Sequence, residues 1–259
     1  MVKVTVGGAT GKLGRLVCDR ICASDDLELV GAIVSESGGN VGRELYPGVI
    51  ASGPGSLHEL LDSTDVYVDL TSPEAASKII ADVPAYGANI ILGTTAVPAD
   101  IIEKMTANVK KNNTSALVSA NFSIGVNVFW KMCAELAKNL PDYDIEIIES
   151  HHSAKKDSPS GTAVETLKRL QEASGIEDTV YGRYGVTGPR KREIGVHAIR
   201  AGDIIGDHTV IFAKNFERLE LTHKAISRET FASGCVESIR WLAGKKDGKV
   251  HTMNEVLDL

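Results

Sequence analysis

Short apolar runs alternate with amphipathic segments through the first half of the chain. The apolar runs, rich in β-branched residues, predict buried strands at residues 2–6, 27–34, 65–70, 89–92 and 115–120. Apolar positions at helical spacing predict helices at residues 12–22, 56–61, 74–83 and 99–109. Strands that alternate with helices predict parallel βαβ units, with helices on both faces of one sheet.

The pattern changes after Phe122. A helix is predicted over residues 123–140, with an inward side made of Val126, Phe129, Met132, Cys133 and Leu136. A second helix is predicted over residues 162–173, ending near Gly175, with Ala163, Val164, Leu167 and Leu170 inward. Alternating runs predict strands at residues 143–150, 193–200, 207–213 and 217–224, and a terminal helix follows at residues 229–244.

These elements define the predicted fold class and domains. We expect an α/β protein with a Rossmann-like parallel-sheet domain, plus an α+β domain with a mixed or antiparallel sheet. The first domain is predicted to comprise residues 1–121 and 229–259, and the second to comprise residues 122–228.

Composition narrows the function classes. Of the 259 residues, 43% are hydrophobic and 24% are charged, as in ordinary globular proteins. The net charge of −6 argues against nucleic acid as a partner, because phosphate binding needs a basic face. The chain begins with a strand pattern rather than a signal peptide, and no apolar run approaches the ~20 residues that span a bilayer. We therefore expect a cytoplasmic protein with no membrane partner.

The cysteines predict no metal site. The chain has Cys18, Cys22, Cys133 and Cys235, and none of them forms a C-x-x-C pair. Cys18 and Cys22 lie four residues apart in a helical pattern, so we expect both to be small buried hydrophobic residues.

Small and hydroxylated residues follow the predicted strands of the first domain. They are Gly7-Gly8, Ser35-Glu36, Thr71-Ser72, Gly93-Thr94-Thr95 and Ala120-Asn121-Phe122. In an open parallel sheet, ligands bind beyond the carboxyl ends of the strands, where helix N-termini present free N–H groups. Five such strand ends predict a dinucleotide crevice.

The loop "GGATGKLG" carries the spacing G-x-x-G-x-x-G from Gly8. It follows a strand and opens a helix, the context in which a glycine fingerprint indicates a dinucleotide site rather than a plain turn. We expect Gly8 to form a tight turn, Gly11 to let a pyrophosphate approach, and Gly14 to let helix and sheet pack closely. The absence of G-K-[ST] argues against a nucleoside triphosphate loop.

The stretch "ESHHSAKKDSPSGTA", residues 149–163, concentrates proton carriers and anion donors. Ser160 is a candidate helix cap, and the alternative is Thr162 with Glu165 closing a capping box. Either arrangement leaves N–H groups free for a carboxylate or phosphate. His151 and His152 follow a strand, and an imidazole with a pKa near 6.5 suits proton transfer. A capped helix beside exposed histidines is the structural alternative, but the nearby cofactor signals favour catalysis.

The same stretch closely resembles the signature of 4-hydroxy-tetrahydrodipicolinate reductases, also called dihydrodipicolinate reductases. The resemblance extends to "GGATGKLG", "GTT" at residues 93–95, "SANFSIGVNV", "RAGDIIGDHTV" and "EVLDL". It implies that His151 donates a proton, that Lys155 is a catalytic lysine, and that the substrate contacts are His152, Ser160, Gly161 and Thr162. The cofactor contacts that it implies are Gly8, Ala9, Thr10, Gly11, Lys12, Leu13, Gly93, Thr94, Thr95, Ser119, Ala120, Asn121 and Phe122.

The resemblance also implies an activity and an assembly. Family members reduce a cyclic dicarboxylate with NADH or NADPH in the diaminopimelate route to lysine. They are typically homotetramers that associate through the second-domain sheets. The family often has an acidic residue after the second strand to hold the ribose, but Ser35 stands there and Glu36 follows. With Lys12 in the glycine loop, we expect dual use of both cofactors.

Two other functions would account for part of the sequence. A dinucleotide-binding sensor would explain the glycine loop but would leave the histidine–lysine stretch without a role. An aldehyde or semialdehyde dehydrogenase needs a cysteine nucleophile, but Cys133 and Cys235 fall within predicted helices.

Overall fold

A sheet of eight strands organises the first of the two units into which the chain divides. The computed structural model describes all of residues 1–259. Unit 1 comprises Met1–Ser123 and Phe231–Leu259, and unit 2 comprises Ile124–Thr230.

The sheet of unit 1 is parallel except at one edge. Its strand order is β13-β7-β6-β5-β1-β2-β4-β3, and only β3 runs antiparallel to its neighbour. The strands are β1 (Val2–Gly7), β2 (Leu27–Ile33), β3 (Glu44–Tyr46), β4 (Val49–Ser52), β5 (Val66–Asp69), β6 (Asn89–Leu92), β7 (Ala116–Val118) and β13 (Val250–His251). The parallel βαβ prediction is confirmed. β3, β4 and β13 escaped prediction because they are short strands near the sheet edges and lack long apolar runs.

Helices cover both faces of this sheet. Alternate residues of β5 enter two different cores, with Val66 and Val68 on one face and Tyr67 on the other. The first face packs against α1 (Lys12–Cys22) and α7 (Glu229–Leu242). The second face packs against α2 (Leu57–Leu61), α3 (Pro73–Ala76) and α4 (Ala99–Lys111). Short elements complete the unit: η1 (Glu36–Gly38), η2 (Pro54–Ser56), η3 (Val83–Tyr86) and α8 (Met253–Val256).

Two local predictions in unit 1 were wrong. The helix expected to reach residue 83 ends at Ala76. The Ser77 hydroxyl bonds the carbonyl of Pro73, and the N–H groups of Lys78 and Ile79 bond three residues back instead of four, so the chain continues as tight turns. Cys22 is exposed, because the last turn of α1 buries Cys18 and Ile21 and places residue 22 outside that stripe.

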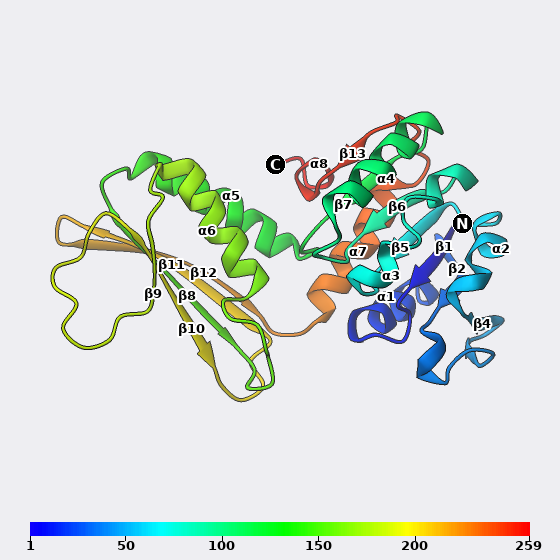
Figure 1. The fold of residues 1–259 in the computed structure, drawn as a ribbon, viewed down its shortest axis with the longest axis horizontal. Helices are drawn as coiled ribbons and strands as arrows, with labels where there is room; N and C mark the ends of the chain where they lie inside the picture. The colour runs from blue at the N-terminus through cyan, green and yellow to red at the C-terminus, as the bar shows by residue number, and fades with distance from the viewer. The chain divides into compact units, whose positions relative to one another are not determined.

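Unit 2 contains a five-stranded mixed sheet with two helices against one face (Figure 1). The strand order is β12-β11-β8-β10-β9, with β10 parallel to β8 and β9 and the other pairs antiparallel. The elements are α5 (Ile124–Asn139), β8 (Asp144–His151), α6 (Gly161–Ser174), β9 (Thr179–Tyr181), β10 (Ile194–Arg200), β11 (Gly206–Lys214) and β12 (Glu217–Ala225). The fold class predicted from the sequence is therefore confirmed.

The inward sides predicted for α5 and α6 need correction. Met132 and Val164 are exposed, whereas Trp130 and Thr166 are buried. In α6 the buried positions are 163, 166, 167 and 170, which follow the helical period more closely than the predicted set did.

Strand register gathers polar residues on the helix-covered face of this sheet. Ile145 and Ile147 of β8 enter the core, and the same alternation places Glu149 and His151 on that face. His208 of β11 stands opposite Glu149, and Arg200 of β10 stands beside His151. The apolar core of unit 2 thus gives way to four ionisable side chains at one end.

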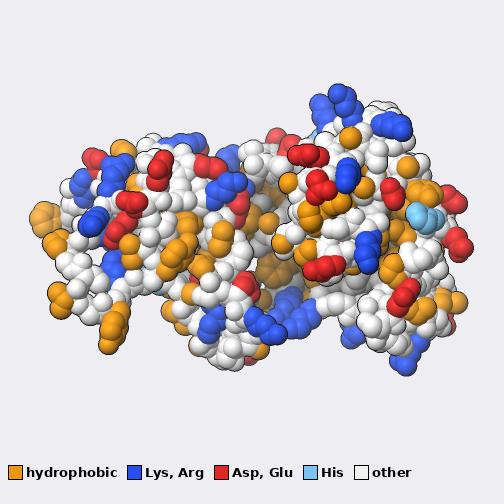
Figure 2. Space-filling view, in the orientation of Figure 1, with side chains coloured by type: hydrophobic (Ala, Val, Ile, Leu, Met, Phe, Trp, Pro, Cys, Tyr) orange, Lys and Arg blue, Asp and Glu red, His pale blue; other side chains and the backbone are white.

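The surface supplies two further facts. Acidic and basic side chains are interspersed over the face shown in Figure 2. Each helix is too short or too polar to cross a membrane.

Candidate active site

The glycine loop of unit 1 joins β1 to α1. Gly8 adopts a φ of +79°, and the N–H groups of Gly8 and Ala9 bond the carbonyl of Ile33, at 2.9 and 3.2 Å. A Cβ on Gly14 would overlap the carbonyl oxygen of Gly8. Gly14 is therefore buried and allows the first turn of α1 to approach closely the chain that directly follows β1.

The first turn of α1 has no side-chain cap. Its cap residue, Gly11, offers no side chain to satisfy the N–H groups of the first turn. Such a helix start favours negative charge, and the missing side chain leaves room for a phosphate to approach the backbone. Of the other predicted contacts in this loop, Thr10 and Leu13 are half-buried, and the exposed Lys12 opens the helix.

Asp69 connects two neighbouring strand ends of unit 1. This fully buried carboxylate accepts hydrogen bonds from the hydroxyls of Tyr67 (2.9 Å), Thr71 (2.8 Å) and Thr94 (2.6 Å). The Thr71 N–H in turn donates to the Thr94 hydroxyl, at 2.9 Å. The Thr94 hydroxyl is therefore held within the protein. Sequence reasoning missed Asp69, although an acidic residue closing an apolar strand was a visible signal.

The predicted cofactor residues after β6 and β7 lie together. A Cβ on Gly93 would lie 2.6 Å from the ring of Phe122, so only glycine allows this approach. The Ser119 hydroxyl donates to the carbonyl of Asn121, at 2.8 Å. Ala120 and the exposed Thr95 complete these two loops.

Ser35 follows β2 and is exposed. Its hydroxyl lies 2.8 Å from that of Ser37, and the residue immediately precedes the short η1 turn without forming a side-chain cap bond. Four of the five strand ends carry predicted cofactor contacts, and all four belong to unit 1, at the carboxyl edge of its parallel sheet.

In unit 2, the candidate chemistry centres on Glu149, which is fully buried. The two terminal nitrogens of Arg200 donate hydrogen bonds to its two oxygens, at 2.9 and 2.8 Å. Nδ1 of His151 lies 2.6 Å from Oε2, and the backbone N–H of Ser160 donates to Oε1 at 3.0 Å. One carboxylate therefore joins two strands, the candidate acid and the start of α6.

Burial and charge perturb these groups in a consistent way. Burial raises the pKa of Glu149, but hydrogen bonds from Arg200, His151 and Ser160 outweigh it, so the pKa lies below its usual value. Burial lowers the pKa of His151, and the Glu149 carboxylate opposes that effect. Burial lowers the pKa of His208 to about 3, so this ring is neutral near pH 7.

The start of α6 settles which residue caps the helix. The Ser160 hydroxyl accepts the N–H of Ala163 at 3.2 Å and lies 3.1 Å from Nε2 of His208. Glu165 forms an ion pair with Arg169 (2.7 Å) instead of closing a capping box. Ser160 is therefore the cap, and Gly161 and Thr162 open the helix where its dipole favours an anion.

The remaining predicted residues lie in the turn between β8 and α6. The N–H of Lys155 donates to the carbonyl of His152 at 3.0 Å. Nζ of Lys155 pairs with Asp157 at 2.9 Å, which lowers the pKa of that aspartate. The half-buried His152 adjoins His151 in the chain. All six predicted catalytic and substrate residues lie between the end of β8 and the first turn of α6 in unit 2.

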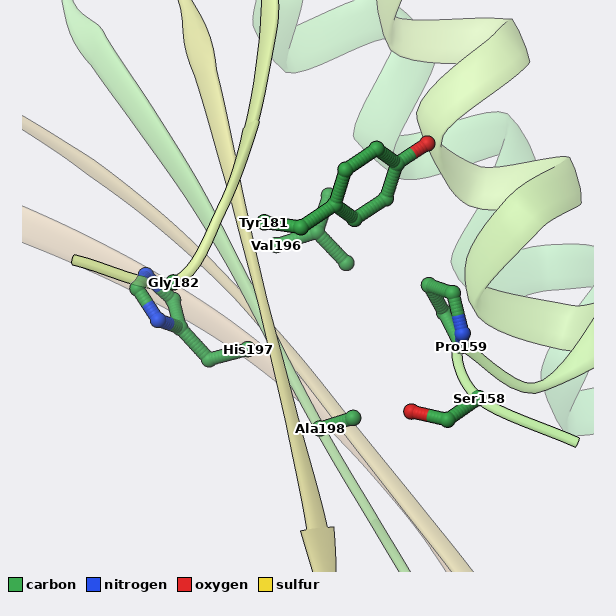
Figure 3. Close-up of a pocket in the computed structure, with 7 residues that line it drawn as sticks. All are labelled: Ser158, Pro159, Tyr181, Gly182, Val196, His197 and Ala198. Atoms are coloured by element: carbon green, nitrogen blue, oxygen red, sulfur yellow. The ribbon is translucent and has the colours of Figure 1, made fainter. Parts of the chain in front are cut away.

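A pocket of about 530 Å³ flanks this segment (Figure 3). Ser158 and Pro159 form one wall, and Val196 and Ala198 of β10 point toward them from the other. Ala198 stands beside Glu149 in the sheet register, so the pocket shares the face that carries the carboxylate.

Sequence reasoning missed the roles of Glu149, Arg200 and His208. Glu149 opened the signature stretch, and the other two fall within "RAGDIIGDHTV", but only pairing of the strands brings them together. No group of three or more His, Cys, Asp or Glu side chains is placed to hold a metal ion.

The parallel sheet with its glycine loop, and the buried acid–base cluster at a helix start, define a dinucleotide-dependent oxidoreductase. The family model described as "Dihydrodipicolinate reductase, N-terminus" matches residues 2–122, and "Dihydrodipicolinate reductase, C-terminus" matches residues 125–257. The chain belongs to the dihydrodipicolinate reductase family, an NAD(P)H-dependent oxidoreductase family of diaminopimelate and lysine biosynthesis.

Individual relatives agree with this assignment. A 4-hydroxy-tetrahydrodipicolinate reductase of Methanocaldococcus jannaschii is 43% identical over 98% of this chain and 97% of the relative. One from Methanosarcina mazei is 42% identical over the full length of both. The solved structure of a dipicolinate-bound dihydrodipicolinate reductase from Paenisporosarcina sp. TG-14 matches with a TM-score of 0.83 and 25% identity, covering 99% of this chain and 100% of that one.

The family predicted from the sequence is therefore confirmed, and the two rival functions are not supported. Cys133 and Cys235 are buried in α5 and α7, and burial raises the pKa of the Cys133 thiol to about 12. A thiol in that state is a poor nucleophile.

Proposed function

We propose that this chain reduces 4-hydroxy-tetrahydrodipicolinate to tetrahydrodipicolinate with NADH or NADPH. One substrate, one reduced nicotinamide and one proton give product, oxidised nicotinamide and water. The observation that carries the proposal is the buried cluster of His151, Glu149 and Arg200 beside the first turn of α6. It offers a proton donor next to a site for a carboxylate, as a dicarboxylate substrate requires.

Unit 2 supplies the substrate contacts in this proposal. The start of α6, with Ser160, Gly161 and Thr162, binds one ring carboxylate through N–H and hydroxyl donors. Lys155 places a positive charge close to this turn, where it balances substrate charge together with His152. The ion pair with Asp157 fixes the position of the Lys155 ammonium, and a substrate carboxylate can interact with the same positive charge.

His151 is the proton donor. The 4-hydroxyl group leaves as water with a hydrogen of the neighbouring ring carbon, which gives a conjugated cyclic imine. When bound, the nicotinamide would supply a hydride to a ring carbon of this imine. The displaced electron pair is then protonated on the neighbouring carbon by His151, through Nε2. Burial lowers the pKa of His151 and so disfavours the protonated form that this step needs. The negative charge of a bound dicarboxylate would act in the opposite direction and favour the protonated form.

Unit 1 supplies the cofactor contacts. Gly8 allows the turn, and the uncapped start of α1 receives the pyrophosphate. At the ribose, Ser35 can donate to either a hydroxyl or a phosphate, and Lys12 is exposed at the helix start. We propose that both NADH and NADPH serve, with affinities within about tenfold of each other, or roughly 1.4 kcal/mol.

The proposed assembly involves the second domain, which also binds the substrate. Residues 1–121 and 229–259 bind the dinucleotide, and residues 122–228 bind substrate and associate into a homotetramer. The sheet of unit 2 supports association, because helices cover one face only and Ile199 is 46% exposed on the other. A cytoplasmic location is supported by four free cysteines, which suit a reducing compartment. Sedimentation would test the tetramer.

The decisive experiment is a coupled assay. An upstream synthase generates the substrate in situ, and oxidation of NADH or NADPH is followed by absorbance at neutral pH. The proposal expects oxidation that depends on the synthase and falls sharply in His151→Gln. If neither cofactor is oxidised while both still bind, the assigned reaction is wrong.

A further inference from the structure

Glu149 forms hydrogen bonds to three groups of the proposed site. Its Oε2 atom bonds Nδ1 of His151, and its Oε1 atom bonds the N–H of Ser160. Arg200 bonds both oxygens, and its own Nη2 also donates to the carbonyl of Asp157, at 2.7 Å. The acid and the anion-binding turn are therefore held by one carboxylate.

We propose that Glu149, clamped by Arg200, is the positioning residue that makes Nε2 of His151 the proton-donating nitrogen and sets its distance from the substrate carboxylate. The inference rests on the proposed function. A carboxylate only accepts hydrogen bonds, so the nitrogen that faces it must keep its hydrogen. Nδ1 therefore stays protonated through the cycle, and Nε2 gives up the proton.

The surroundings of Nε2 agree with this assignment. A Cβ on Gly206 would lie only 3.0 Å from Nε2, so glycine leaves this side of the ring uncrowded. The edge of the ring meets His208, with centroids 5.2 Å apart and planes at 75°. His208 is neutral near pH 7, so it does not repel the charged form of His151 at that pH.

Arg200 explains why Glu149 does not take the proton itself. Its guanidinium forms a two-pronged pair with the carboxylate, which favours the ionised form. The charges facing His151 are then the Glu149 carboxylate, which raises its pKa, and Lys155 and Arg200, which lower it. Removing the Glu149 charge must therefore move the pKa of His151 downward.

Glu149→Gln tests this role most directly, because the neighbouring donors determine which way the new amide group turns. An amide NH₂ group at the Oε1 position would face two donors, Arg200 and the Ser160 N–H. An NH₂ group at the Oε2 position would face one obligatory donor, Arg200, and the ring of His151, which can change tautomer. The second orientation has fewer conflicts, so the amide would donate to Nδ1 and force the hydrogen onto Nε2.

The experiment measures tautomer, turnover and cofactor binding separately. In ¹⁵N-histidine spectra at high pH, the wild type is expected to show the Nδ1–H form of His151, and Glu149→Gln the Nε2–H form. The His151→Gln spectrum assigns the signal. Turnover is expected to fall about 10–100-fold, less than for loss of the acid itself. The descending alkaline limb of kcat/KM moves to lower pH, and NADH affinity is unchanged.

Asp247→Asn is the matched control. It removes a carboxylate that also bonds a histidine, with Nε2 of His251 3.0 Å from Oδ2, but within unit 1. This variant should leave the turnover, the His151 tautomer and the pH limb unchanged. If Glu149→Gln does not fold, Glu149→Gln with Arg200→Gln removes both buried charges and serves for the tautomer measurement.

The results separate this inference from the proposed function. Retention of the Nδ1–H form or of the wild-type pH limb in Glu149→Gln would overturn the positioning role. The spectra do not need turnover, so a wild type that is inactive in the coupled assay refutes the reaction alone. A variant that loses only stability, with normal tautomer and pH limb, would reduce Glu149 to a structural ion pair.

Discussion

Acid stability of unit 2 should depend strongly on His208. His208 is 3% exposed and has a pKa of about 3, against about 6.5 in an unfolded chain. Its Nδ1 has no hydrogen-bond partner, so no hydrogen bond offsets the cost of burying this nitrogen. The charged groups that act on it are His151, His223 and Lys155, which lower the pKa, and Glu149, which raises it.

The sign and size of the effect follow from linkage. A base with a depressed native pKa takes up a proton more readily when unfolded, so the native state loses stability as pH falls below 6.5. The loss continues until the native group titrates near pH 3. Between pH 7.5 and pH 5, this single residue costs roughly 2 kcal/mol of unfolding free energy. His208→Gln, whose amide nitrogen can keep the bond to Ser160, should remove that loss.

The chain offers a clean assay. Its two tryptophans lie one in each unit, Trp130 in α5 and Trp241 in α7. In a Trp241→Phe background, urea unfolding followed by fluorescence reports on Trp130, which is buried in unit 2. Comparison of wild-type and Gln chains at pH 7.5 and pH 5 isolates the contribution of His208, because the other histidines are common to both. Equal losses in the two chains would refute the reasoning.

Four further predictions concern the site. His151→Gln should lower turnover roughly 10²–10³-fold without changing cofactor affinity, as binding and rate assays together would show. Thr162→Val should raise KM and spare nicotinamide binding; equal loss of both would mean that the turn serves the cofactor. Lys12→Ala should weaken NADPH selectively, measured as the ratio of dissociation constants, unless the lysine serves the shared pyrophosphate. Asp69→Ala should weaken both cofactors several-fold and equally, because the Thr94 loop loses its acceptor.

The sequence alone determined the parts of this protein that depend on local pattern. Buried strands need apolar runs and amphipathic helices need a 3.6-residue period, so the β1–α1 unit, α4 and the two-part fold were predictable. The glycine loop and the signature segment were equally visible, because turn geometry and helix capping are read within a few residues. Where local signals were weak, prediction failed in part: α3 ends earlier than predicted, and β13 was missed.

Tertiary structure alone decided how the chemistry is organised. Glu149, Arg200 and His208 lie on three strands, and only the pairing of β8 with β10 and β11 places them on one face. Asp69 similarly reaches Thr94 because β5 and β6 end side by side. Folding then shifts the pKa values of these histidines away from their ordinary values. The shift depends on how completely each ring is removed from water and on which charged groups lie close to it. Sequence spacing encodes neither quantity, because both arise from residues that are distant in the chain.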